Sequence, residues 1–167
     1  MTGPATGDPA RGTSAPPRSA GTRDAIPARD ATGALLALIA AGLALRVIIA
    51  YLLPGSGFEV DLNAFKFWAA DLAEHGPWGF YERPFFHDYT PGYLYILWGL
   101  GYLGQALGGL GDLIKAPAIV ADLVLAWLVA GMVRELGGSQ RRALGAAALV
   151  LFVPITWFDS VVWGQVD

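Results

Sequence analysis

Four apolar segments constrain the fold of this chain more than any other feature. Residues 34–53 are apolar throughout except for Arg46, and about 20 helical residues extend about 30 Å, the thickness of a bilayer core. Three further apolar runs follow at residues 92–110, 114–133 and 143–158. Charged residues make up 15% of the chain, whereas an ordinary soluble domain has about 25%. The sequence therefore predicts an all-α integral membrane protein.

The first part of the chain has a different composition. Residues 1–33 are rich in Gly, Pro, Ala, Thr and Ser, and their charged residues are scattered, so they have no apolar face to bury. This predicts a disordered tail, followed by one membrane domain over residues 34–167. A cleaved signal peptide fits residues 34–53 less well, because its apolar part would be shorter.

Arginines next to the apolar runs predict how the chain crosses the membrane. Cytoplasmic loops are enriched in Lys and Arg, and basic residues occur both in the N-terminal tail and between the last two runs. They are Arg23, Arg29, Arg134, Arg141 and Arg142. An even number of crossings must separate two cytoplasmic segments. Residues 34–53 and 114–133 supply two crossings between the two arginine-containing segments, and a third crossing by residues 92–110 would make the number odd. Residues 34–53, 114–133 and 143–158 are therefore predicted to span a plasma membrane, and the glycine-rich residues 92–110 to be only partly embedded.

This topology places the N-terminus in the cytoplasm and residues 54–91 in an extracytoplasmic loop, on the same side as the C-terminal residues. Within the loop, apolar side chains recur at helical spacing over residues 61–75, while Lys66, Asp71 and Glu74 lie off that stripe. The apolar positions are Leu62, Phe65, Trp68, Ala69 and Leu72. We expect an amphipathic juxtamembrane helix in the membrane interface, ended by Gly76.

Asp61 is the leading catalytic candidate. A carboxylate at the mouth of a membrane helix, near many aromatic side chains, is placed to act as a general base. The alternative is structural: Asp is a preferred N-cap residue, and Asp61 begins the predicted helix. Glu59 lies two residues earlier and is either an assisting carboxylate or a solvated one.

The remaining polar candidates each have two interpretations. His87 is a proton carrier or a polar contact, and Asp88 is a substrate ligand or the start of an Asx turn. Tyr89 and the surrounding aromatic residues stack on sugar rings or form an interfacial belt. Arg46 and Lys115, near the outer ends of two spans, bind a phosphate or extend towards the headgroups.

Several classes of function find no support in the composition. A net charge of −3 gives no basic surface for nucleic acid. The chain has no cysteine and two histidines, so neither thiolate nor multi-histidine metal sites are available. There is no glycine-rich phosphate loop or nucleophile elbow. We therefore predict no metal and no cofactor.

Three short motifs, in order, resemble one family. The segment from Asp61 to Trp68 is similar to the first outer loop of the glucosyltransferases of N-glycan precursor assembly, and residues 87–93 resemble their Asp-Tyr-Pro-Pro segment with Thr90 in place of the first proline. Residues 163–167, with Trp163, Gln165 and Asp167, look like the Trp-Gly-Gln-x-Asp of bacterial mannosyltransferases related to the GPI mannosyltransferases. The chain thus resembles the polyprenol-phosphate-sugar-dependent glycosyltransferases of the GT-C fold.

This resemblance implies a function and a set of roles. Asp61 would be the general base in an inverting transfer of a mannosyl or glucosyl unit from a polyprenyl-phosphate sugar to an acceptor hydroxyl on a glycan, lipid or protein. The polar candidates above, with Trp163, Gln165 and Asp167, would bind substrate. Because the family carries further donor-binding residues on later helices, the 167 residues are expected to be an N-terminal portion that is inactive alone.

Two rival classes stay open at this level. In a membrane transporter or lipid flippase, Arg46 and Asp122 would line a path, and Asp61 would only cap a helix. Internal inverted repeats would favour that class, and none is visible. A structural membrane subunit fits less well, because polar and aromatic residues are concentrated in one loop.

Overall fold

The computed structural model describes residue 3, residues 28–53 and residues 57–163, and this part of the chain is helical with no strand. The predicted all-α class is therefore confirmed for the described residues. The main helices are α1 (Ala28–Val47), α2 (Glu59–His75), α3 (Pro91–Leu107), α4 (Ala116–Glu135), α5 (Gln140–Phe152) and α6 (Pro154–Trp157). Short 3-10 helices cover Phe80–Glu82 (η2) and Gly111–Lys115 (η3), and π-helical turns cover Ile48–Leu52 (η1) and Phe158–Trp163 (η4).

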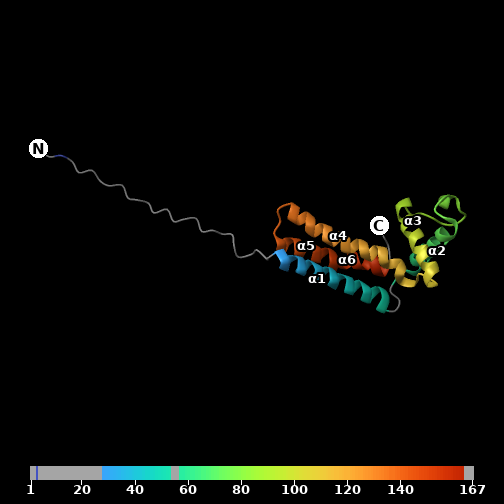
Figure 1. Ribbon diagram of the computed structural model, residues 1–167, viewed down its shortest axis with the longest axis horizontal. Coiled ribbons are helices and arrows are strands. Elements are labelled where there is room, and N and C mark those ends of the chain that lie inside the picture. Colours follow the sequence, from blue (N-terminus) through green and yellow to red (C-terminus); the bar gives the residue numbers. More distant parts are fainter. Residues whose placement is uncertain (1–2, 4–27, 54–56, 164–167) are drawn as a thin grey trace.

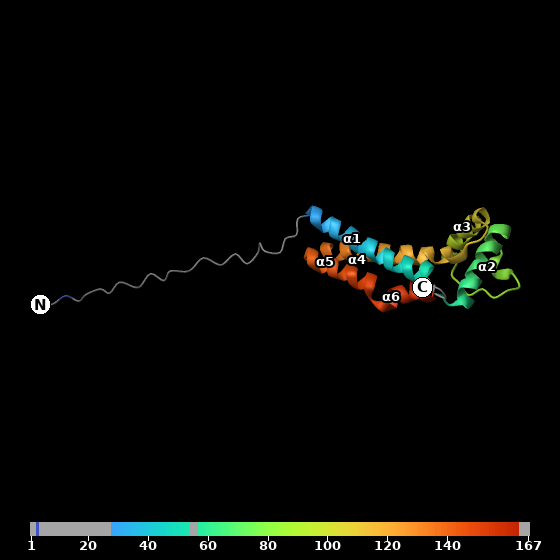
Figure 2. The ribbon, with the colours of Figure 1, turned by 90° about the horizontal axis from the view of Figure 1, so that it is seen from below.

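Helices α1, α4 and α5 lie side by side and form an elongated bundle, which α6 continues (Figures 1 and 2). Two of its helical segments, Asp30–Leu52 and Gly111–Glu135, are long and apolar enough to cross a membrane. A third candidate is the pair Gln140–Phe152 and Pro154–Trp163, which is bent by 43°. The bend falls at Pro154, which cannot donate a backbone hydrogen bond. The Thr156 hydroxyl donates instead to the Val150 carbonyl at 2.7 Å.

Small side chains bring the bundle helices together. Ala126 and Ala130 of α4 are buried against Ala143 and Ala147 of α5. Small residues allow the helix backbones to approach closely, which is the usual way for apolar helices to pack in a membrane. Leu151 of α5 is buried in the same cluster, against Gly42 of α1.

Helices α2 and α3 pack on each other beyond one end of the bundle (Figure 1). The predicted apolar stripe of α2 is confirmed, because all five of its members are buried. They contact Tyr93, Leu94 and Leu97 of α3 in one hydrophobic cluster. Gly76, with φ of 75°, ends α2 as expected.

Helix α3 belongs to the α2–α3 unit beyond the end of the bundle (Figure 1). This helix has 17 residues, packs on α2 and is not among the candidate spans. Whether it is embedded in a membrane stays a prediction.

The N-terminal tail is shorter than predicted. We expected disorder up to residue 33, but α1 already begins at Ala28. Asp30 lies in the first turn, where a carboxylate interacts favourably with the helix dipole. Residues 1–2 and 4–27 lie outside the described part of the chain.

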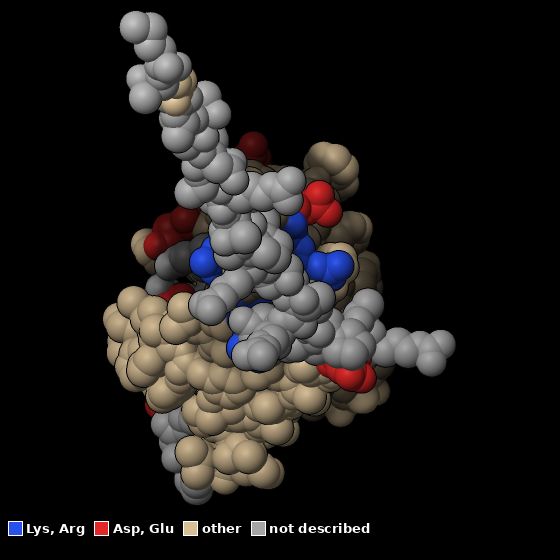
Figure 3. Space-filling view, turned by 90° about the vertical axis from the view of Figure 1, so that its left-hand side faces the viewer, with Lys and Arg blue, Asp and Glu red and all other residues tan. Residues whose placement is uncertain are grey.

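The two ends of the bundle differ in charge. Arg134 is in the last turn of α4, and Arg141 and Arg142 are in the first turn of α5. Figure 3 views the end of the molecule where α4 and α5 meet, and Lys and Arg side chains gather there. The α2–α3 unit lies at the opposite end (Figures 1 and 2).

Candidate functional site

Asp61 lies in the first turn of α2, but it does not cap the helix. The helix begins at Glu59, and the N-cap position is Phe58, whose side chain makes no capping hydrogen bond. The capping interpretation of Asp61 is therefore wrong. Two more residues join the helix than expected, and acidic side chains in its first turn favour this start.

The Asp61 carboxylate instead contacts the far end of the chain. The indole Nε1–H of Trp163 donates to Asp61 Oδ2 at 2.9 Å, between residues 102 positions apart. The Trp163 ring also lies 5.6 Å from the ring of Phe58, which directly precedes α2. Two of the three motifs that carry the resemblance thus meet at this carboxylate.

Two π-helical turns place Trp163 there. The turn η1 ends α1, and η4 ends the helix pair α5–α6; the two contact each other at the end of the bundle near α2. The core between them consists of Ala50, Ile119 and Val161. Single π turns inside helices are often found at functional sites, because they change the direction of a side chain.

Asp61 also lines a small pocket of about 120 Å³ on the α2 surface. Asp88 and Tyr89 of the α2–α3 loop line it as well, together with aromatic side chains of α2. The α2 residues are Phe65 and Trp68, and Phe86 of the loop also lines the pocket. Carboxylates beside aromatic rings offer hydrogen-bond acceptors for hydroxyl groups and flat apolar faces for a sugar ring.

The wall of this pocket is fixed by ring packing and hydrogen bonds. Trp68 Nε1–H donates to the Phe86 carbonyl at 3.0 Å, and the Tyr81 hydroxyl donates to the Tyr89 carbonyl at 2.7 Å. The Tyr89 ring lies 5.0 Å from Phe65 and 5.2 Å from Tyr93. These contacts within the folded loop therefore fix the shape of the pocket.

Tyr93 stands behind this wall as a neutral group. Its hydroxyl is buried and has no hydrogen-bond partner among the described residues. Burial raises the pKa of the Tyr93 phenol above its usual value, so this residue keeps its proton even in alkaline solution.

Of the two other carboxylate candidates, Asp88 lines the pocket of Asp61 and Glu59 does not. The Asp88 side chain is exposed and forms no hydrogen bond or ion pair with the described residues, so the expected Asx turn is not formed. The next helix is capped by Thr90 without a side-chain bond and has Pro91 at its start. Glu59 is exposed and does not line the pocket.

His87 packs among aromatic rings and forms no hydrogen bond or ion pair with the described residues, so the expected polar contact is not formed. Its ring contacts three aromatic rings, with centroids between 5.4 and 6.0 Å away. These rings belong to Phe80, Tyr81 and Phe85. His87 does not line the pocket of Asp61.

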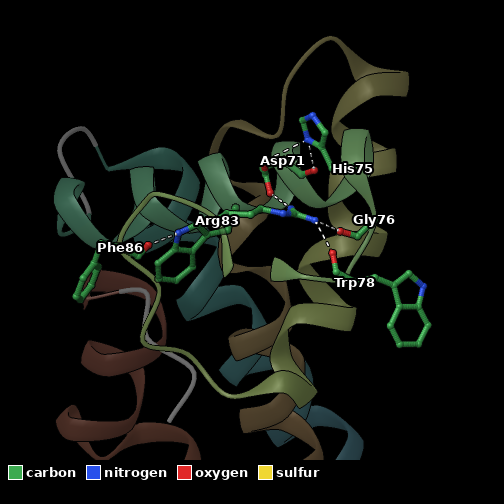
Figure 4. Close-up of polar contacts among 7 residues, drawn as sticks. Asp71, His75, Gly76, Trp78, Arg83 and Phe86 are labelled. Atoms are coloured by element: carbon green, nitrogen blue, oxygen red, sulfur yellow. Dashed lines mark hydrogen bonds and ion pairs between the residues drawn. The ribbon is translucent and has the colours of Figure 1, made fainter. Parts of the chain in front are cut away.

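Arg83 holds the loop and was missed by the sequence analysis (Figure 4). Its guanidinium forms an ion pair with Asp71 and donates to the carbonyls of Gly76 and Trp78 at 2.6 and 3.1 Å. It also lies 5.4 Å from the centre of the Phe80 ring. An acidic residue on the polar side of a helix, followed by a loop arginine, is too common a pattern to identify such a pair in advance.

Arg46 is not available to a substrate. Its side chain is fully buried in the bundle, and its guanidinium forms an ion pair with Asp122 at 2.8 Å. It also donates to the carbonyls of Gly42 and Leu151 at 3.1 and 3.0 Å. Neither expectation for Arg46, binding a phosphate or extending to the headgroups, fits this position. Its side chain instead joins α1, α4 and α5. Asp122 thus contributes to the packing of α4 on α1 through this ion pair.

Lys115 is also enclosed and lies outside the pocket of Asp61. It has no exposed surface, and its ammonium lies 3.4 Å from the Ala50 carbonyl and 3.8 Å from Asp112. The buried position results from η3, which turns the residue into the junction between α1 and the α2–α3 unit. The expectation that Lys115 binds a substrate phosphate does not fit this position.

Two further expected substrate ligands, Gln165 and Asp167, lie outside the described residues. Within the described ranges, no group of three or more His, Asp or Glu side chains is arranged to hold a metal ion. No lysine or arginine of the described chain lines the pocket of Asp61.

The geometry of this site defines what it can do. An ionised Asp61 can accept a proton from a hydroxyl group held in the pocket, and Trp163 fixes one of its oxygens. Comparisons of the chain with protein-family models, with curated proteins and with solved structures find no match.

Proposed function

We propose that this chain carries the catalytic loop of a membrane glycosyltransferase that uses a polyprenyl-phosphate sugar, with Asp61 as the general base. One observation carries the proposal: Asp61 lines an aromatic pocket and is bound by Trp163 from the opposite end of the sequence. The resemblance of both segments to GT-C glycosyltransferases supports it. A carboxylate that only capped a helix would not need this distant partner.

The proposed reaction is a single displacement with inversion. Asp61 takes the proton of an acceptor hydroxyl while that oxygen attacks the anomeric carbon of the donor sugar. The bond from the anomeric carbon to the phosphate oxygen breaks on the opposite face, and the polyprenyl phosphate leaves with the bonding electrons. The aromatic rings beside Asp61 orient the reacting sugar, which lowers the entropic barrier.

The roles of the other residues follow from their positions. Asp88 accepts hydrogen bonds from sugar hydroxyls at the rim of the pocket, and Tyr89 supplies an apolar face. Trp163 is assigned as a positioning residue, because its N–H fixes the carboxylate that reacts. Departure of the phosphate requires positive or hydrogen-bonding groups. Arg46 and Lys115 are not assigned this role, because both side chains are fully buried.

We also propose a plasma-membrane location with the site on the extracytoplasmic side. The support is the basic end of the bundle, where Arg134, Arg141 and Arg142 lie opposite the α2–α3 unit. Basic residues next to spanning helices favour the cytoplasmic side. The N-terminus would then be cytoplasmic, and the chain would cross the membrane three times.

The transporter alternative has one relevant observation, the ion pair between Arg46 and Asp122 inside two candidate spans. In a transport path, at least one of these groups would face a water-filled cavity. Arg46 is instead fully buried and also binds two backbone carbonyls. These contacts support a packing role.

The test is sugar transfer in membranes of the native host that carry either the natural protein or the Asp61→Asn variant, with a panel of polyprenyl-phosphate hexoses. Asparagine keeps the size of the side chain and can still accept the Trp163 hydrogen bond, but it cannot take the proton. We expect transfer to fall at least about 100-fold, the lower range for loss of a general base.

The matched control is Glu74→Gln, which removes an exposed carboxylate from the same helix outside the pocket. It should transfer sugar at the natural rate. Equal rates for the natural protein and Asp61→Asn, at equal protein levels, would remove Asp61 from the reaction. No transfer from any donor by the natural protein would refute the proposed enzyme class.

A further inference from the structure

A second and larger cavity lies on the α2–α3 unit, away from the pocket of Asp61. It is a groove of about 400 Å³ between α2 and the C-terminal half of α3. The two cavities share no lining residue. The groove is therefore free for a ligand that takes no part in the proposed reaction.

The walls of the groove are mainly apolar and small. Gly101 and Gly104 line it from α3, and Gly108 lines it where that helix ends. Leu110 packs over Gly104: a Cβ built there would lie 2.9 Å from Leu110 Cγ. Gly101 packs directly on the Ala69 carbonyl of α2, whereas a Cβ at Gly108 or Gly109 would meet nothing within 4 Å. The groove is therefore open to a slender apolar chain at the end formed by Gly108 and Gly109.

One cation, Lys66, stands in this apolar lining. Its side chain is partly buried, and within the described residues it forms no hydrogen bond or ion pair. Ala70 lies one helical turn further along α2 and lines the same groove. An unpaired ammonium group at an apolar groove is complementary to a ligand with an anionic head and a hydrocarbon chain.

The position of the groove indicates where such a ligand comes from. Leu110 directly precedes Gly111, the first residue of the candidate span Gly111–Glu135. The groove therefore lies at the level where a spanning helix would leave the bilayer. At that depth, lipid headgroups and the first part of their acyl chains are the surrounding molecules.

We propose that this groove binds one anionic glycerophospholipid of the bilayer, with its phosphate at Lys66 and the upper part of one acyl chain between α2 and α3. The lipid anchors the α2–α3 unit to the membrane surface. The proposal goes beyond glycosyl transfer and does not depend on it.

The test is lipid retention by the full chain purified in neutral detergent micelles, titrated with phosphatidylglycerol or phosphatidylcholine and examined by native mass spectrometry. We expect one saturable phosphatidylglycerol and no saturable phosphatidylcholine. Lys66→Gln should weaken retention about fivefold, the effect of one basic residue near an anionic lipid, and Lys66→Arg should restore it. Ala70→Phe should abolish saturable retention by filling the groove.

Two control variants match these changes. Ala106→Phe adds the same side chain at an exposed position of α3 that does not line the groove. Arg142→Gln removes one positive charge at the opposite end of the bundle. Both should bind phosphatidylglycerol like the natural protein, and circular dichroism should show that all variants keep their helices.

Three results would overturn the proposal. The first is equal retention of phosphatidylglycerol and phosphatidylcholine. The second is unchanged retention in folded Lys66→Gln and Ala70→Phe. The third is preferred retention of a polyprenyl phosphate when both anionic lipids are offered together, which would assign the groove to the donor lipid instead.

Discussion

The ion pair between Arg46 and Asp122 gives the sharpest stability prediction. The Arg46 side chain is fully buried, and Asp122 is only 16% exposed. In Asp122→Leu, the guanidinium keeps two carbonyl partners but loses its only countercharge among the described residues. Removing one member of a buried pair costs about 3–5 kcal/mol. Because two hydrogen bonds stay in place, we expect a loss of about 3 kcal/mol.

Replacing both members should recover much of that loss. Arg46→Met with Asp122→Leu removes both charges of this pair and keeps apolar volume in the bundle. Such replacements are often neutral or stabilising. We expect the double variant to be at least about 2 kcal/mol more stable than Asp122→Leu alone.

The assay is chemical unfolding in detergent micelles followed by circular dichroism, with the four forms of a double-mutant cycle. The control is Glu135→Gln, an exposed carboxylate on the same helix, which should change the free energy of unfolding by less than about 0.5 kcal/mol. A loss below about 1 kcal/mol in Asp122→Leu, or a double variant as unstable as the single one, would refute the reasoning.

Three further predictions concern single contacts. Gly101→Ala should lower the free energy of unfolding by about 1–3 kcal/mol, because a Cβ there would lie 1.9 Å from the Ala69 carbonyl oxygen; Gly99→Ala, which meets nothing within 4 Å, should not destabilise the protein. Arg83→Gln should lower the free energy of unfolding by about 1–3 kcal/mol and speed amide hydrogen exchange in the α2–α3 loop. Unchanged exchange would contradict the proposed role of the Arg83 contacts in holding this loop. Trp163→Phe keeps an aromatic ring but removes the indole N–H, so sugar transfer should fall about tenfold while lipid retention in the groove stays unchanged.

The helices were the most predictable part of the structure. Apolar periodicity located the buried face of α2, and Gly76 marked its end, because both signals are local in sequence. The start of α2 was misplaced by two residues, since no side-chain cap marks it. The start of α1 was misplaced because the alanine-rich residues after Ala28 suit a helix as well as a tail.

Long-range contacts could not be derived from local patterns. Arg46 and Asp122 are 76 positions apart, and each had several possible partners until the bundle fixed their distance. The contact of Asp61 with Trp163 spans 102 positions and depends on two π-helical turns that no sequence pattern predicted. Charge placement did predict that both residues lie at the same end of the molecule.

The measurement that tests the central claim most directly is a double-mutant cycle on sugar transfer with Asp61→Asn and Trp163→Phe. If Trp163 acts by positioning the Asp61 carboxylate, its loss should matter only while that carboxylate is present. We therefore predict that the double variant transfers sugar as slowly as Asp61→Asn alone. Two losses that multiply would show that the residues act independently, and this result would contradict a single site built around the Asp61 carboxylate.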